Sequence, residues 1–255
     1  MRLSRNNLEY IGADIIDRYK SLLHINRLER VDIDYLAETL LGLRIDCRHL
    51  SLAGDILGLT SFDEIGVEVF PQDTDSSEMP FYILDGKTIL IESNLTREGA
   101  NIGRRNYTVS HEVCHHIMRR LFPHDYSSKV KGRVVRFCYR DRSSGARDWE
   151  EWRVETLAAI ILLPAECVLR SMDSFGLGAQ IRLLNRIFAP EVYGKFVQMA
   201  EFLGASKTAL AIRMMQLGLL KRNDLKDPYA LISIEMDKEE DLSDEYYNEN
   251  CQEVS

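Results

Sequence analysis

The chain has 255 residues, 45% of them hydrophobic and 28% charged, which is the balance of a globular protein with one domain, or one domain and a small appendage. Its formal net charge of −8 argues against broad binding to nucleic acids, because attraction to phosphate groups requires a basic face. The five cysteines are scattered, and the first residues, MRLSRNNLEY, lack the pattern of a signal peptide, which argues against a secreted protein. The apolar runs are too short to cross a bilayer, which argues against a membrane protein. Together these features predict a cytoplasmic protein.

The N-terminal part of the chain predicts two helices followed by two strands. Apolar residues recur at helical spacing over Leu8–Leu23, which predicts a first amphipathic helix. A second helix is expected to begin at Asp32 or Asp34 as its N-cap and to end at Gly42. Short strands are expected after it, over residues 43–47 and 65–70.

The clearest strand pair lies at residues 81–92, FYILDGKTILIE. Two β-rich runs flank Asp85-Gly86, a dipeptide that favours a hairpin with a type I′ turn. A loop rich in Asn, Gly and Arg then leads to a helix for which Asn106 or Thr108 is the expected N-cap.

The second half of the chain is expected to be mainly helical. Residues 133–139 are typical of a strand within a solvated basic segment, and residues 148–163 predict a long helix that ends at Pro164. Helices are also expected over residues 179–220, and the acidic residues 237–255 predict a mobile tail. The predicted fold class is therefore α+β, with a small twisted sheet covered by a helix and a mostly helical C-terminal half.

The helix that follows the Asn-rich loop carries the sequence HEVCH, an HExxH motif. Positions i and i+4 share one helix face, so His111 and His115 can bind one zinc ion together. Glu112 can act as general base toward a water on that ion. Catalytic zinc usually takes three protein ligands, so a third must come from elsewhere. The candidates are Glu150, Glu151 and Glu155 on the next long helix, and His116, His124 and Asp125 nearby.

Spacing favours a glutamate of the long helix as the third ligand. His116 directly follows the second motif histidine, so it points about 100° away around the helix. His124 does not fit the longer HExxHxxGxxH pattern. Glu151 has an alternative role as the capping-box partner of Asp148, and Glu155 has one as a solvated helix residue. The spacing alone leaves both glutamates open.

Five blocks of sequence, in the same order, resemble the ImmA/IrrE family of metallopeptidases. The segment RRNYTVSHEVCH is similar to the family's RRFTxAHExGH, and EWRVETLAAIILLP is similar to its ExxANxFAAxLLMP. The other three blocks are VDIDYLA, TILI and FLGASKTALAIRMMQLGL. Together they cover about residues 31–220.

The resemblance implies a zinc metallo-endopeptidase with a zincin-type active-site helix. It places the third ligand on Glu151, so that this residue, His111 and His115 form a gluzincin-like site for Zn2+ with Glu112 as the catalytic base. The chain departs from the family at Val154-Glu155, which replaces an Ala-Asn pair. Glu155 therefore remains a competing candidate for the third ligand. The implied substrate is a protein, namely a helix-turn-helix transcriptional repressor in stress or mobile-element regulation.

These inferences define three expected regions. Residues 1–175 form the metallopeptidase domain, residues 176–225 form a helical C-terminal subdomain with a helix-turn-helix-like segment, and residues 226–255 form the acidic tail. A second donor for the oxyanion is expected, and the unranked candidates are Tyr107, His116 and Tyr139.

Two rival functions belong to other classes. A DNA-binding regulator is one, because Phe202–Leu217 has helix-turn-helix rhythm with Lys207 and Arg213 on its second helix. An inactive protein that keeps the metallopeptidase fold is the other. Under the favoured hypothesis the partner is a protein substrate, and neither direct contact with nucleic acid nor a membrane is expected.

Overall fold

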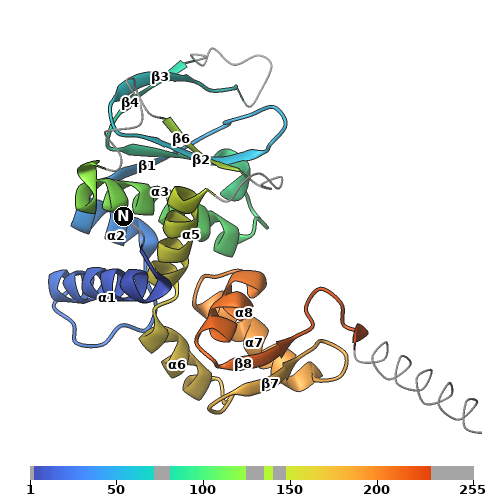
Figure 1. The fold of residues 1–255 in the computed structure, drawn as a ribbon. Coiled ribbons are helices and arrows are strands. Elements are labelled where there is room, and N and C mark those ends of the chain that lie inside the picture. The colour runs from blue at the N-terminus through green and yellow to red at the C-terminus, as the bar shows by residue number, and fades with distance from the viewer. Residues whose placement is uncertain (1–2, 72–80, 125–134, 140–147, 231–255) are drawn as a thin grey trace, which may run out of the picture.

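A computed structural model describes residues 3–71, 81–124, 135–139 and 148–230. These residues form a mixed α+β fold, as the sequence predicts. Figure 1 shows the larger sheets at one end, a layer of crossing helices in the middle and a helical region with a small sheet at the other end. No helix within these ranges has both the length and the apolar character that crossing a membrane requires.

The main sheet has four strands in the order β1-β5-β2-β6. The strands of the upper part are β1 (Arg44–Arg48), β2 (Ile56–Ser61), β3 (Glu64–Glu68), β4 (Phe81–Asp85), β5 (Thr88–Glu92) and β6 (Val135–Tyr139). β1 runs parallel to β5, and β2 runs antiparallel to β5 and β6. β3 and β4 form a separate antiparallel pair, joined to the main sheet through an apolar cluster that includes Leu59, Val67, Leu84 and Leu90.

The expected hairpin at residues 81–92 is wrong, although both of its strands exist. β4 pairs with β3, whereas β5 pairs with β1 and β2, so the chain passes from one sheet to the other at this turn. A type I′ turn needs positive φ at both central residues, and only Gly86 has it, at 76°. The Asp85 carboxylate instead accepts hydrogen bonds from the Lys87 N–H (3.0 Å) and the Thr88 hydroxyl (2.8 Å), which stabilises the passage between sheets.

The helix that carries the motif, α3 (Ile102–Leu121), lies against one face of the main sheet. Its N-cap is Asn101, whose side chain accepts a hydrogen bond from the Arg104 N–H at 3.0 Å, so the expected caps Asn106 and Thr108 are wrong. Both residues lie inside the helix. The Asn106 amide instead donates to the carbonyl of Gly204 at 3.0 Å, which ties the start of α3 to the C-terminal part of the chain.

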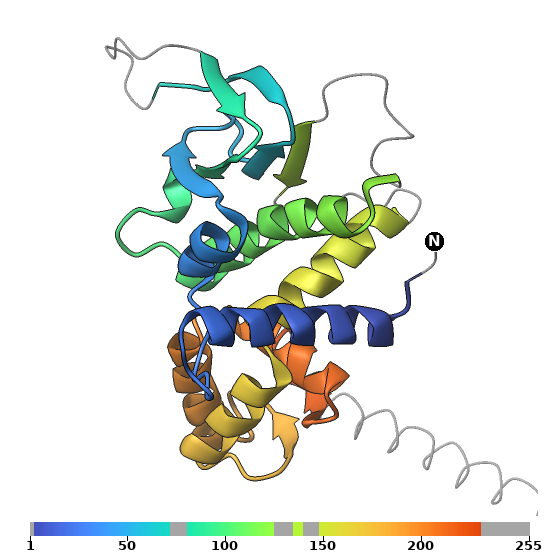
Figure 2. The same cartoon turned by 90° about the vertical axis from the view of Figure 1, so that its left-hand side faces the viewer.

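Three further helices surround α3, as Figure 2 shows from the side. They are α1 (Arg5–Leu22), α2 (Ile33–Leu41) and α5 (Trp149–Leu162). The predicted boundaries of α2 are confirmed, because Asp32 caps its first turn and Gly42 ends it with a left-handed φ of 65°. α5 crosses α3 and also packs on α1, where Gly12 allows close approach because an added Cβ would clash with Ile160.

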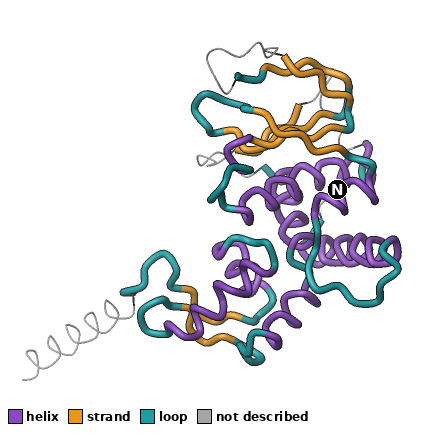
Figure 3. The backbone as a smooth tube through the Cα atoms, turned by 180° about the vertical axis from the view of Figure 1, so that it is seen from behind, coloured by secondary structure: helices purple, strands orange, loops and turns teal. Residues whose placement is uncertain are grey.

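The C-terminal region is less purely helical than expected. It contains α6 (Ala165–Ser174), α7 (Pro190–Phe202) and α8 (Lys207–Gln216), together with two short strands, β7 (Ile181–Leu184) and β8 (Leu220–Asn223). These strands pair in parallel and are visible from behind in Figure 3. One apolar cluster continues from α3 and α5 into α7 and α8, so residues on both sides of position 175 share a core. The expected acidic tail from residue 231 onward lies outside the described residues.

Candidate metal centre

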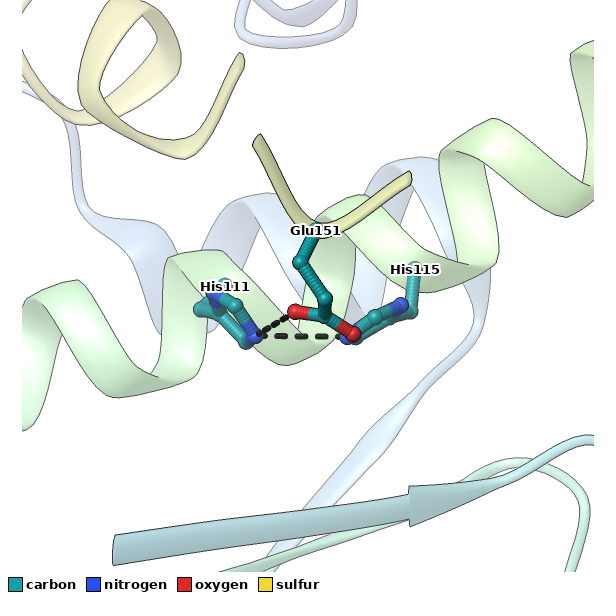
Figure 4. Close-up of side chains that lie close together, drawn as sticks. All are labelled: His111, His115 and Glu151. Carbon is teal, nitrogen blue, oxygen red and sulfur yellow. Dashed lines mark hydrogen bonds and ion pairs between the residues drawn. The ribbon is translucent and has the colours of Figure 1, made fainter. Parts of the chain in front are cut away.

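Three buried side chains from two helices meet between α3 and α5. The Nε2 atoms of His111 and His115 lie 3.2 Å apart. The Oε2 atom of Glu151 lies 3.4 Å from His111 Nε2, and its Oε1 atom lies 3.6 Å from His115 Nε2. In Figure 4 the glutamate descends from α5 and points between the two histidine rings of α3. Two imidazoles and one carboxylate that converge in this way form a group able to hold a metal ion.

The position of α3 explains why both histidines are buried. The helix lies between the sheet and α5, so every residue from Thr108 to Met118 is buried. His111 and His115 are four positions apart in the sequence and therefore face α5 together. His116 points elsewhere, because its Nε2 lies 2.8 Å from the Thr60 hydroxyl on β2 and its ring packs edge-on against Phe62. It therefore does not join the other two histidines.

The first turn of α5 brings Glu151 to the histidines. Asp148 caps this helix, since its carboxylate accepts hydrogen bonds from the N–H groups of Glu150 (2.9 Å) and Glu151 (3.5 Å). The Glu151 carboxylate turns toward α3 and shares a buried face of α5 with Val154 and Ala158. Glu155 lies one turn further on and is only half-buried, and its peptide oxygen accepts a hydrogen bond from the Tyr107 hydroxyl at 3.4 Å. Of the two competing glutamates, Glu151 therefore lies at the histidines.

Burial keeps His115 in the neutral state that binding to a metal requires. The pKa of His115 lies well below its ordinary value, chiefly because burial disfavours the charged ring and secondly because of His111. A neutral imidazole keeps a lone pair on one nitrogen, and this lone pair is what binds a metal. The nearby His116 also titrates low, with burial, Arg120 and Arg119 lowering its pKa to about 4.

Glu112, the expected base, is completely buried on the side of α3 that faces the sheet. It packs over Gly58 of β2, where an added Cβ would lie 2.9 Å from Glu112 Oε1. A carboxylate oxygen of Glu112, a ring nitrogen of His111 and the sulfur of Cys138 all lie within 4.8 Å of one another. The carboxylate is thus adjacent to the metal-binding group without belonging to it.

Two residues of β6 beside this centre were not identified from the sequence. Arg136 forms an ion pair with Glu150 at 2.5 Å, which joins β6 to the first turn of α5, and its charge also lowers the pKa of His115. Cys138, two residues on, lies on the same strand face, toward α3. Because side chains alternate between the two faces of a strand, the segment VVRFCY puts Arg136 and Cys138 on the same face. Only the tertiary structure shows that this face meets α3.

Of the remaining candidates, Tyr139 and His124 lie toward the surface of the protein. Tyr139 is half-exposed and its ring lies 6.1 Å from that of Phe137, on the face of β6 opposite Cys138. His124 follows the end of α3 and is exposed, and Asp125 lies outside the described residues. Among the described residues, Tyr107 contacts the backbone of α5 through its hydroxyl.

Comparison with models of protein families and with curated proteins finds no match for this chain.

Proposed function

We propose that this chain is a zinc-dependent endopeptidase that cleaves a protein substrate. The observation that carries the proposal is the convergence of His111, His115 and Glu151 from two helices, with the Glu112 carboxylate beside them. Two histidines and a glutamate are the protein ligands of one well-known class of catalytic zinc site, which leaves a fourth position open.

The spacing of the ligand atoms supports zinc. Zinc binds imidazole nitrogen and carboxylate oxygen at about 2.0–2.2 Å, so the ligand atoms of a tetrahedral site lie about 3.3–3.6 Å from one another. His111 Nε2 lies 3.2 Å from His115 Nε2 and 3.4 Å from Glu151 Oε2, and the other carboxylate oxygen, Oε1, lies 3.6 Å from His115 Nε2. These spacings are of the size that a tetrahedral zinc site requires.

The proposed mechanism is hydrolysis of a peptide bond by an activated water. When bound, zinc lowers the pKa of a water and polarises the scissile carbonyl. His111, His115 and Glu151 would hold the ion, and their burial would exclude bulk water from its protein side. Glu112 accepts a proton from the attacking water on its carboxylate and returns a proton to the nitrogen of the leaving amine.

An extended polypeptide suits the strand beside this centre. β6 is an edge strand of the main sheet within the described part of the chain, and its Cys138 lies close to Glu112 and His111. A peptide can add to such an edge as a further strand, and main-chain hydrogen bonds then place an internal peptide bond near the ligands. This supports an endopeptidase, and the resemblance to ImmA/IrrE proteins suggests a helix-turn-helix repressor as the substrate.

The test combines metal analysis with cleavage of a candidate repressor encoded beside this protein. The wild type is expected to bind about one zinc ion per chain and to cleave the repressor, and removal of zinc by a chelator is expected to stop cleavage. Glu112→Gln is expected to keep the metal and to lose about 10²–10⁴-fold in cleavage rate, because a glutamine cannot accept the proton.

The matched control for this test is Glu191→Gln. Glu191 is an exposed residue of α7 that pairs with Lys195, so the substitution changes one surface carboxylate at a distance from the centre. It is expected to retain both zinc and cleavage. Cleavage at the wild-type rate by Glu112→Gln, with zinc still bound, would refute the proposed mechanism.

A further inference from the structure

Cys138 brings a sulfur donor close to His111 of the metal centre. It lies on β6 and pairs across the sheet with Gly58, the residue over which Glu112 packs. Its Sγ lies within 4.8 Å of a ring nitrogen of His111 and of a carboxylate oxygen of Glu112. His111 therefore belongs to two donor groups at once, one with His115 and Glu151 and one with Glu112 and Cys138.

We propose that Cys138 is a fourth protein ligand of the same metal ion and that its thiolate holds the centre in a latent state. This inference rests on the proposed function and names a regulation of that site. In a tetrahedral zinc site a sulfur and a nitrogen lie about 3.6 Å apart, so Sγ must move toward His111 and also toward His115 and Glu151, with which it is not grouped, to join the ion. Thiolates are preferred ligands of zinc, which favours this movement once the ion is present.

The ligand exchange accounts for latency. When bound, the metal would take the Cys138 sulfur as a ligand in place of a water molecule, and the thiol proton would pass to solvent. The centre would then lack its water nucleophile. In the reverse exchange a water molecule would replace the sulfur, and the thiol would regain its proton.

Cys114 and Cys47 do not share this position. Cys114 lies inside the motif but is completely buried in the core, and burial raises the pKa of its thiol far above the ordinary value. Cys47 lies on β1, the opposite edge strand of the same sheet. Neither belongs to a metal-binding group among the residues that the structure describes. Cys47 is therefore a matched control for Cys138, because both lie on edge strands.

The test uses Co2+ as a spectroscopic substitute for zinc. A thiolate bound to Co2+ produces an intense charge-transfer absorption in the near ultraviolet, whereas nitrogen and oxygen ligands produce only weak visible bands. The wild type and Cys47→Ser are expected to show both absorptions. Cys138→Ser and Cys138→Ala are expected to lose the charge-transfer absorption and to keep the visible bands, which report that the histidine–glutamate centre is still folded.

Absence of the charge-transfer absorption from the cobalt-loaded wild type would overturn the proposal, as would its persistence in Cys138→Ser. If the variants lose the absorption and no form cleaves protein, the ligand assignment stands and the peptidase function falls. If the wild type does cleave, Cys138→Ser is expected to cleave faster than Cys47→Ser. Equal rates for these two variants would overturn the latent role.

Discussion

Gly58 on β2 lies directly against Glu112 on α3. A Cβ atom at position 58 would lie 2.9 Å from Glu112 Oε1 and 2.6 Å from the methyl group of Thr108, closer than packed side chains approach one another. The glycine thus allows the helix that carries both motif histidines to lie close to the sheet. It also leaves the space that the Glu112 carboxylate occupies.

Gly58→Ala tests this relationship. The added methyl group must displace Glu112, Thr108 or the helix itself, and overpacking of this kind costs about 1–3 kcal/mol of stability. We expect a lower midpoint of thermal unfolding and a lower cleavage rate with zinc still bound. Gly66→Ala on β3 is the control, because no atom lies within 4 Å of its added methyl group. Equal effects of the two substitutions would contradict the structural role of Gly58.

The assignment of the third ligand predicts a contrast between two glutamates of α5. Glu151→Ala is expected to weaken zinc binding by more than about 100-fold, since even partners outside the ligand set typically contribute 10–100-fold. Glu155→Ala is expected to leave zinc binding nearly unchanged. Competition with a chromogenic chelator measures both affinities. Loss of zinc by Glu155→Ala together with full retention by Glu151→Ala would reverse the assignment.

Arg213 is buried, which bears on the rival function of DNA binding. Its side chain is 1% exposed, its guanidinium pairs with the Glu9 carboxylate (Nη2 to Oε2, 2.9 Å), and its Nε donates to the carbonyl of Leu163 at 3.0 Å. An arginine that reads DNA must reach the groove. Arg213 instead connects α8 to α1 and to the end of α5.

Arg213→Ala is accordingly expected to act on stability. We expect a loss of about 3 kcal/mol in the free energy of unfolding, at the low end for buried ion pairs because Glu9 is partly exposed. Lys207→Ala, at the exposed start of α8, is expected to change stability by no more than about 0.5 kcal/mol. Urea unfolding measures both. A stable Arg213→Ala protein that loses sequence-specific binding in a gel-shift assay would instead favour the DNA-binding function.

Glu92 predicts a pH dependence of stability. Burial alone would raise the pKa of this carboxyl, but hydrogen bonds from the Leu50 N–H (2.8 Å), His49 Nδ1 (2.9 Å) and the Asn94 N–H (3.1 Å) hold it below the ordinary 4.5. The folded protein therefore takes up this proton at a lower pH than the unfolded chain does. Its contribution is fully present above pH 4.5 and is lost as the pH falls through the folded pKa.

Glu92→Gln is therefore expected to lower stability at neutral pH and to flatten the decline below pH 4.5. Thermal unfolding of both proteins between neutral pH and about pH 3 measures the difference. The two curves are expected to converge at low pH, where the native glutamate is protonated as well. Parallel curves for the two proteins would show that Glu92 is not responsible for the acid sensitivity.

Elements with a strong local pattern were predicted well, and elements whose existence depends on distant partners were not. The helix between Asp32 and Gly42 was correct because its cap and its terminating glycine are local signals. β2 was missed because it is buried on both faces, so its sequence does not alternate between polar and apolar residues. β7 and β8 were missed because the short strands, which pair Ile181 with Leu220, stabilise each other only when α7 and α8 bring them together.

By itself, the sequence determined that His111 and His115 share one helix face with Glu112 beside them, because the geometry of a single helix follows from its spacing. Only the tertiary structure decided that Glu151 rather than Glu155 meets the histidines, since that depends on where α5 crosses α3. It likewise placed Cys138 beside the centre, because strand pairing and the packed face of β6 arise from contacts between segments far apart in the chain.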